Sequence, residues 1–283
     1  MEPEPTQQPT TATRQWCRDD FKTPPIKNRR FLVRLDISKQ SFEQSANALV
    51  DAIQEKGHFD QRGMKAQWDF RLDLQGKAPK PKVLLTHIPL VTRSANEKGP
   101  KTVVELHPPI EGNLAQLMIE QDCTDEVISR YEDLEREIHE WLPFVMEHFK
   151  VTRIGGFVLE YRNLIQRHRY PMFWKGEQSL EIGKLLRIFQ NNANPGNFVP
   201  PFSVEFNTAS PLPGSGNIRF HMEAVHQGNH ELCLEVMLAY NSLARKDKRS
   251  SPGLFAELAD AHGLLFDNFV RQFSPDALDA FTQ

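Results

Sequence analysis

The stretch Phe31-Leu32-Val33-Arg34-Leu35-Asp36-Ile37 decides the class of fold. Apolar side chains recur at every second residue, with Arg34 and Asp36 between them, which is the period of a β-strand with one buried face. Comparable runs at 66–74, 83–91, 102–107, 154–165, 200–207, 217–226 and 231–240 predict further strands. Lys-, Pro- and Gly-rich connections separate several of these runs, which favours antiparallel pairing.

Other segments show the period of a helix. The predicted helices run from Ser41 to about Lys56, over 125–149, 177–189 and 252–273, and in a short last segment after Ser274-Pro275-Asp276. Ser41 and Thr124 are the predicted N-caps of the first two, and Gly57 is the predicted stop of the first. Pro143 lies inside the apolar seam of 125–149 and should kink or split that helix.

The order of these elements predicts an α+β fold. We expect two similar halves, residues 23–150 and 151–283, each an antiparallel sheet packed by helices. A long helix would close each half. Residues 1–22 are rich in Pro, Thr, Gln and Glu and predict a flexible polar leader.

Composition excludes several classes of protein. Among the 283 residues, 19 Phe, 4 Trp and 4 Tyr exclude a wholly disordered chain. The net charge of −3, from 34 Lys+Arg and 37 Asp+Glu, argues against a protein that coats polyanions. The three dispersed cysteines and the lack of a signal peptide or membrane span predict a cytoplasmic protein without membrane association.

The segment 162–175 is the strongest local candidate for a ligand surface. It carries cations among aromatic side chains and holds no acidic residue. Guanidinium groups bind phosphates and aromatic rings stack on bases, so we predict a ligand site there. Its residues would be Arg162, Arg167, Arg169, Tyr170 and Trp174. The alternative is a loop whose aromatic residues anchor it to the core and whose arginines are solvated or paired.

Acidic residues gather at the opposite pole of the chain. Most of them fall off the apolar seam of the predicted 125–149 helix, so we interpret them as a solvated helix face. The residues are Glu120, Asp122, Asp125, Glu126, Glu132, Asp133, Glu135, Glu137 and Glu140.

Histidines provide the remaining candidate chemistry. His221, His226 and His230 are weak candidates for zinc ligands, because the short ligand pairs CxxC and HExxH are absent. The alternative is a polar hairpin with exposed histidines. His262 lies on the apolar stripe of the last long helix, and we interpret it as a buried histidine bonded to a nearby group, since no partner nucleophile is identifiable.

Three stretches together carry a family resemblance. They are Thr23-Pro24-Pro25-Ile26 with Phe31–Leu35, Arg153-Ile154-Gly155 with Tyr161 and Asn163 behind it, and the segment 257–281 with His262, Phe266, Phe269 and Phe281. The chain resembles a sporadically distributed family of uncharacterised bacterial proteins. The patchy occurrence of that family implies an accessory role, such as defence or toxin control.

No phosphate-binding loop, nucleophile elbow or zinc-protease motif is present, so we expect no catalytic residue and no cofactor. We therefore predict a non-enzymatic binding or regulatory protein that acts through a protein partner, as an antitoxin-like or defence-system component. The alternative is a nucleotide or nucleic-acid binding protein that uses the 162–175 segment. A metal-dependent hydrolase that uses the 221–230 histidines is the third hypothesis.

Overall fold

The computed structural model describes residues 16–21, 24–56, 67–73, 80–93, 100–109, 114–123, 130–176, 179–190, 203–209, 216–227, 231–242 and 251–282. The strands are β1 (Ile26–Asp36), β2 (Gln67–Asp73), β3 (Lys80–Arg93), β4 (Lys101–His107), β5 (Leu114–Asp122), β6 (Ile154–Gln166), β7 (Trp174–Lys175), β8 (Ser179–Leu180), β9 (Ser203–Ala209), β10 (Gly216–Gln227) and β11 (Glu231–Ser242). The α-helices are α1 (Lys39–Lys56), α2 (Tyr131–His148), α3 (Ile182–Leu185), α4 (Ser251–Gln272) and α5 (Pro275–Ala280). Short 3-10 helices are η1 (Arg18–Asp20), η2 (Pro171–Phe173) and η3 (Arg187–Phe189).

One large antiparallel sheet organises the described part of the chain. Its order is β2-β3-β4-β5-β1-β6-β11-β10-β9, and β7 and β8 form a separate small pair. In the middle, β1 pairs with β5 on one side and with β6 on the other. The α+β class and the antiparallel pairing predicted from the sequence are therefore confirmed.

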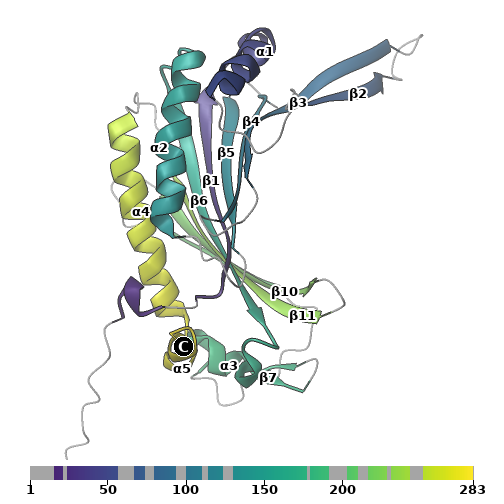
Figure 1. The fold of residues 1–283 in the computed structure, drawn as a ribbon. Coiled ribbons are helices and arrows are strands. Elements are labelled where there is room, and N and C mark those ends of the chain that lie inside the picture. Colours follow the sequence, from purple (N-terminus) through teal and green to yellow (C-terminus); the bar gives the residue numbers. More distant parts are fainter. Residues whose placement is uncertain are drawn as a thin grey trace, which may run out of the picture.

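The long helices cover one face of this sheet (Figure 1). Helix α2 packs on β5 and β1, α4 packs on β11 and β6, and α1 packs on β3. The face that they cover carries the apolar rows of β1, β4 and β5. In β1, Phe31, Val33 and Leu35 are fully buried, whereas Arg34 and Asp36 are exposed. The alternation read from the sequence therefore separates the two faces of the sheet.

The helix seams follow the predicted spacing. Tyr131, Leu134, Ile138, Trp141 and Val145 of α2 are buried, as are Leu254, Leu258, Ala261, Leu265 and Phe269 of α4. Ser274 caps α5, because its hydroxyl accepts a hydrogen bond of 3.0 Å from the Ala277 amide. Among the described residues, no helix is long and apolar enough to cross a membrane.

Two details of the predicted helices are wrong. Helix α1 begins at Lys39, and the Ser38 hydroxyl rather than Ser41 accepts a bond at its start, from the Ser41 amide at 3.1 Å. Helix α2 is not split at Pro143, since it runs unbroken from Tyr131 to His148. The predicted cap Thr124 and the predicted stop Gly57 lie outside the described residues.

The helix predicted over 177–189 is also wrong. Gly176 has a φ of 67° and makes a turn between β7 and β8, which pairs Leu180 with Trp174. Within 179–189, the part of this segment that the structure describes, only α3 is α-helical, and Leu186 then bridges to Phe273 from the end of the chain. The apolar residues of this segment therefore pack against the C-terminal residues instead of forming one helical stripe.

Part of the acidic pole is a strand. Residues 114–122 form β5, and the Asn28 side-chain amide donates to Glu120 at 2.9 Å and to Asp122 at 2.8 Å. In α2, Glu137 is 3% exposed and lies beside Arg93 and the Trp141 indole nitrogen. These carboxylates have specific partners, so the prediction of a solvated helix face is wrong for them.

A close backbone approach explains the glycine of the Arg153-Ile154-Gly155 motif. A Cβ atom at Gly155 would lie 2.9 Å from Arg34 Cβ and 3.2 Å from the Arg34 carbonyl oxygen. Both contacts are on β1, which pairs with β6 near this point. A side chain at Gly155 would therefore push the two central strands apart.

We expect Gly155→Ala to lower the free energy of unfolding by about 1–3 kcal/mol, because the added methyl group overpacks a rigid strand. Gly263→Ala in α4 is the matched control. Its Cβ would have an ordinary contact of 3.5 Å with Arg18, and alanine favours the helix by about 0.5–1 kcal/mol. Urea unfolding of both variants tests this, and equal effects would contradict the close-approach argument.

Candidate functional site

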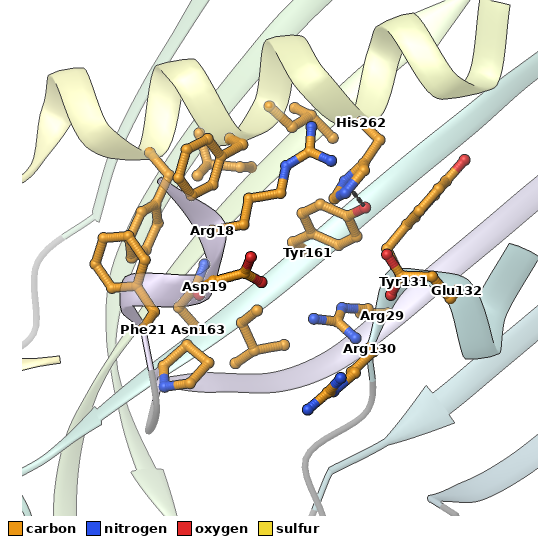
Figure 2. A pocket seen from close by; sticks show the side chains of 16 residues that line it. Arg18, Asp19, Phe21, Arg29, Arg130, Tyr131, Glu132, Tyr161, Asn163 and His262 are labelled. Carbon is orange, nitrogen blue, oxygen red and sulfur yellow. Dashed lines mark hydrogen bonds between the residues drawn. The ribbon is translucent and has the colours of Figure 1, made fainter. Parts of the chain in front are cut away.

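A cavity of about 570 Å³ lies between α4 and the covered face of the sheet. Figure 2 shows its wall, to which η1, β1, β6, α2 and α4 contribute side chains. Ile26 and Arg29 come from β1, Tyr161 and Asn163 from β6, and Leu238 from β11. The central strands of the fold therefore form its floor.

The register of these strands fixes the floor. Arg29 pairs directly with Tyr161, and Tyr161 pairs directly with Leu238 on the next strand. Directly opposite residues of antiparallel strands point to the same face, so the three side chains form one row. All three are buried, and the Arg29 guanidinium lies 5.6 Å from the centroid of the Tyr161 ring.

A tyrosine–histidine pair joins the floor to α4. The Tyr161 hydroxyl and His262 Nδ1 are 2.7 Å apart, a hydrogen bond that links β6 to the helix above it (Figure 2). Tyr131, at the start of α2, stacks on His262 with 3.8 Å between ring centroids. The interpretation of His262 as a buried, hydrogen-bonded histidine agrees with this geometry.

Burial lowers the pKa of His262 to about 3, and the nearby Arg18 and Arg29 guanidiniums add to this effect. Burial also raises the pKa of the Tyr161 and Tyr131 hydroxyls. At neutral pH the imidazole is therefore uncharged and both phenols are protonated. In the tautomer with the proton on Nε2, Tyr161 donates its hydrogen bond to Nδ1.

Charged groups surround this uncharged pair. Arg18 of η1, Arg29 of β1 and Arg130 before α2 line the cavity, against two carboxylates, Asp19 and Glu132. In Figure 2, Arg18 and Arg29 approach the cavity from opposite sides of Tyr161. Among the described residues that line the cavity, the polar part of the wall therefore combines arginines with carboxylates.

The other part of the wall is apolar. Phe21, which follows η1, makes edge contacts with Phe266 and Phe269 of α4 at centroid distances of 5.9 and 5.8 Å. Arg18 lies 5.5 Å from the centroid of the Phe266 ring. Residues 16–21 belong to the predicted flexible leader, yet here they are packed on α4 and complete the cavity.

The arrangement combines a cationic, hydrogen-bonding region with an aromatic one. Pockets of about 300–1,000 Å³ with mostly apolar walls and a few placed polar groups are typical of small-molecule sites. Among the described residues, no group of three or more His, Cys, Asp or Glu side chains is placed to hold a metal ion. The chemistry that this wall offers is the binding of an amphipathic organic molecule.

The residues predicted as a ligand site at 162–175 lie elsewhere. Tyr170 and Trp174 are 3% and 8% exposed, and Tyr170 packs on Phe281 at 5.3 Å between centroids. Arg162 Nε donates to Glu160 at 2.7 Å on the face of the sheet opposite α2 and α4. Arg167 and Arg169 are half-buried in the turn after β6. For Tyr170 and Trp174, the burial agrees with the alternative to a ligand site, a loop whose aromatic residues anchor it to the core.

The candidate zinc ligands are only partly within the described residues. His221 lies 3.6 Å from Glu205 and 3.3 Å from Glu223 on the uncovered face of β10. In the predicted hairpin of β10 and β11, His226 pairs with Leu232. His230 lies outside the described residues.

The patterns in the sequence do not bring Arg29, Tyr161 and His262 together as one site. One signal could have done so, because each is a polar residue in an inward-facing apolar row. Arg29 lies two residues before buried Phe31, and His262 lies between buried Leu258 and Leu265. Their convergence, however, depends on the pairing of distant strands.

Comparisons with known proteins add little. No protein-family model and no curated protein matches the chain. DynU16, a protein of the dynemicin biosynthetic locus, aligns at 11% identity and a TM-score of 0.23, over 90% of this chain and 97% of that one. The di-domain ARO/CYC protein BexL of the BE-7585A biosynthetic pathway aligns at 7% identity and a TM-score of 0.20, over the same fractions. Such low TM-scores carry no argument about this chain.

We expect His262 to make stability fall in acid. The unfolded chain protonates this residue near pH 6.5, whereas the folded chain keeps it neutral down to about pH 3. The unfolded state therefore binds the extra proton, and its contribution lowers the free energy of unfolding by about 1.4 kcal/mol per pH unit between those values. Urea unfolding between about pH 7 and pH 4 measures this slope.

His262→Gln is the control, because it cannot titrate and should have a shallower slope by that amount. A nuclear magnetic resonance titration of the His262 ring in the unaltered protein gives an independent check. Its ring signals should show no protonation step above about pH 4. Equal slopes in the two proteins, or a ring that titrates near pH 6.5, would contradict the prediction.

Proposed function

We propose that this protein is a non-enzymatic binding protein that takes a small amphipathic organic molecule into the cavity between α4 and the sheet. The observation that carries the proposal is the two-part wall. Phe21, Phe266 and Phe269 line one part, and Arg18, Arg29 and the Tyr161–His262 pair line the other. With a volume of about 570 Å³, the cavity is in the range of small-molecule sites.

The burial of Arg29 supports the proposal further. It is 7% exposed and occupies an inward position on β1 that Phe31, Val33 and Leu35 occupy further along the strand. Placing a guanidinium in an apolar row costs folding free energy compared with an apolar side chain. At this position the guanidinium lies 5.6 Å from the centroid of the Tyr161 ring and lines the cavity.

A regulatory role through a protein partner, as an antitoxin-like or defence-system component, remains a proposal that rests on the family resemblance. A ligand-binding cavity is compatible with it, since occupancy of the cavity would then report on a small molecule. Nucleotide or nucleic-acid binding at 162–175 also remains a proposal. Its support is the partial exposure of Arg162, Arg167 and Arg169.

We also propose that residues 23–150 and 151–283 are two similar halves whose strands share one sheet. Two features of the topology support this. The halves begin with β1 and β6, which pair at the centre of the sheet. Each half also places a long helix, α2 or α4, on the same face after its last large strand.

The neutral fluorescent probe N-phenylnaphthylamine tests the binding function. We expect saturable binding of one probe molecule per chain, with increased fluorescence in the apolar part of the cavity. Ile26→Trp places a larger side chain in the cavity wall and should weaken binding at least about tenfold, or about 1.4 kcal/mol.

Ile188→Trp is the matched control, because Ile188 is 48% exposed and does not line the cavity. It should bind the probe as the unaltered protein does. Circular dichroism shows whether both variants retain the fold. Absence of binding to the unaltered protein, or equal binding to both folded variants, would overturn the proposed function.

A further inference from the structure

We infer that two copies of this chain associate through strand β2, which pairs antiparallel with β2 of the second copy and joins the two sheets into one. Such a dimer is a property separate from the proposed binding of a small molecule. Three observations lead to it: the position of β2 in the sheet, the order of its residues, and the registers that this order excludes.

Strand β2 lies at one end of the large sheet. Its residues 67–73 pair with residues 80–87 of β3, whereas residues 88–93 of β3 pair with β4. Within the described ranges, this end of the sheet is therefore a ribbon of two strands, which extends away from α2 and α4 (Figure 1). An edge strand presents backbone N–H and C=O groups to a further strand, and a two-stranded ribbon is only marginally stable by itself. Pairing of two such ribbons would give four consecutive strands.

The residues of β2 are arranged symmetrically about Phe70. Opposite charges, Asp69 and Arg71, stand one position before and after it, and two apolar residues, Trp68 and Leu72, stand two positions before and after it. In an antiparallel pair with a two-fold axis at Phe70, Asp69 lies opposite Arg71 of the second copy, and Trp68 lies opposite Leu72 of the second copy. Each pair occurs twice, as a two-fold interface requires, and pairs of both kinds stabilise a sheet. The strand is therefore self-complementary.

The neighbouring registers of two β2 strands are unfavourable. If the two-fold axis passes through Asp69, the two copies of Asp69 lie opposite each other, and if it passes through Arg71, the two copies of Arg71 do. Like charges at directly opposite positions destabilise a pair of strands. If the axis passes between Phe70 and either neighbour, charged residues lie opposite apolar ones, because a shift by one residue exchanges the faces. The order of residues therefore selects the register centred on Phe70.

The strand at the other end of the sheet, β9, lacks this symmetry. An axis through its central residue, Phe206, would place Glu205 opposite Asn207, which carries no charge. Glu205 also has a partner within its own chain, since Arg219 of β10 lies 2.7 Å from it. Pairing of β2 with β2 closes the assembly at two copies, because the same edge serves both of them. Pairing of β2 with β9 would instead continue from copy to copy.

Sedimentation velocity of the full chain over a range of concentrations tests the association. We expect a reversible dimer, with twice the chain mass of 32.6 kDa, that dissociates on dilution. Arg71→Glu places negative charges opposite each other at two positions and should raise the dissociation constant of the dimer at least about tenfold. Asp69→Arg should do the same through positive charges. Each variant should therefore be monomeric at concentrations where the unaltered protein is a dimer.

A mixture of these two variants gives the most specific result. Asp69→Arg chains carry two positive charges at positions 69 and 71, and Arg71→Glu chains carry two negative charges there. In the register centred on Phe70 every charge of one variant meets an opposite charge of the other. Variants that are monomeric alone should therefore form a dimer with one copy of each when mixed. The double variant Asp69→Arg/Arg71→Glu, which exchanges the two charges, should dimerise with itself but not with the unaltered chain.

Arg271→Glu is the matched control, because it makes the same change of charge at an exposed residue of α4. It should dimerise as the unaltered protein does. Circular dichroism shows whether each variant folds, and the double variant decides the question if a single variant does not fold. An unaltered protein that stays monomeric, forms larger assemblies, or keeps its dimer in both single variants would overturn the inference, as would folded variants that do not associate when mixed. Dimers that return in the mixture would support it.

Discussion

The antiparallel pairing of β1 with β6 is the constraint on which the rest of the structure depends. It joins segments about 130 residues apart, as the Arg30–Glu160 ion pair of 3.0 Å shows directly. On one side of this pair of strands the sheet continues through β5, and on the other through β11. Helices α2 and α4 then cover the two sides of the junction. The cavity lies over the junction itself, so its floor exists only when both segments have folded together.

The three stretches that carry the family resemblance meet at this cavity. Pro24 and Ile26 come from the first, Tyr161 and Asn163 from the second, and His262, Phe266 and Phe269 from the third. Gly155 has a different role, since it allows the close approach of β6 to β1. Residues that are widely separated in the chain and unremarkable one at a time thus become parts of a single wall.

Local patterns predicted the elements well and their assembly poorly. Alternation identified β1 and β4, because each has one buried row and one row that is more exposed, and apolar runs identified β6 and β11. It missed β5, whose Glu120 and Asp122 were interpreted as helix charges, since a sequence does not show that Asn28 lies opposite them. It also gave 177–189 to a helix, because the partner of Leu186 is Phe273, far along the chain. The site was missed for the same reason, as the row of Arg29, Tyr161 and Leu238 is a product of strand register.

Two consecutive residues of strand β6 place an uncharged side chain on one face of the sheet and a charged, ion-paired side chain on the other. Tyr161 faces the cavity, whereas Glu160 faces outward and accepts bonds from Arg30 at 3.0 Å and from Arg162 at 2.7 Å. A shift of β6 by a single residue would exchange the faces, which would place the Glu160 carboxylate under α4, away from Arg30 and Arg162, and would move the tyrosine to the opposite face. Any such misaligned sheet would lose both the outer ion pairs and the bond to His262. Interactions on both faces of β6 therefore favour the native register of the central strands. A one-residue insertion or deletion within β6 would for this reason lower the stability of the protein far more than one in a connecting loop.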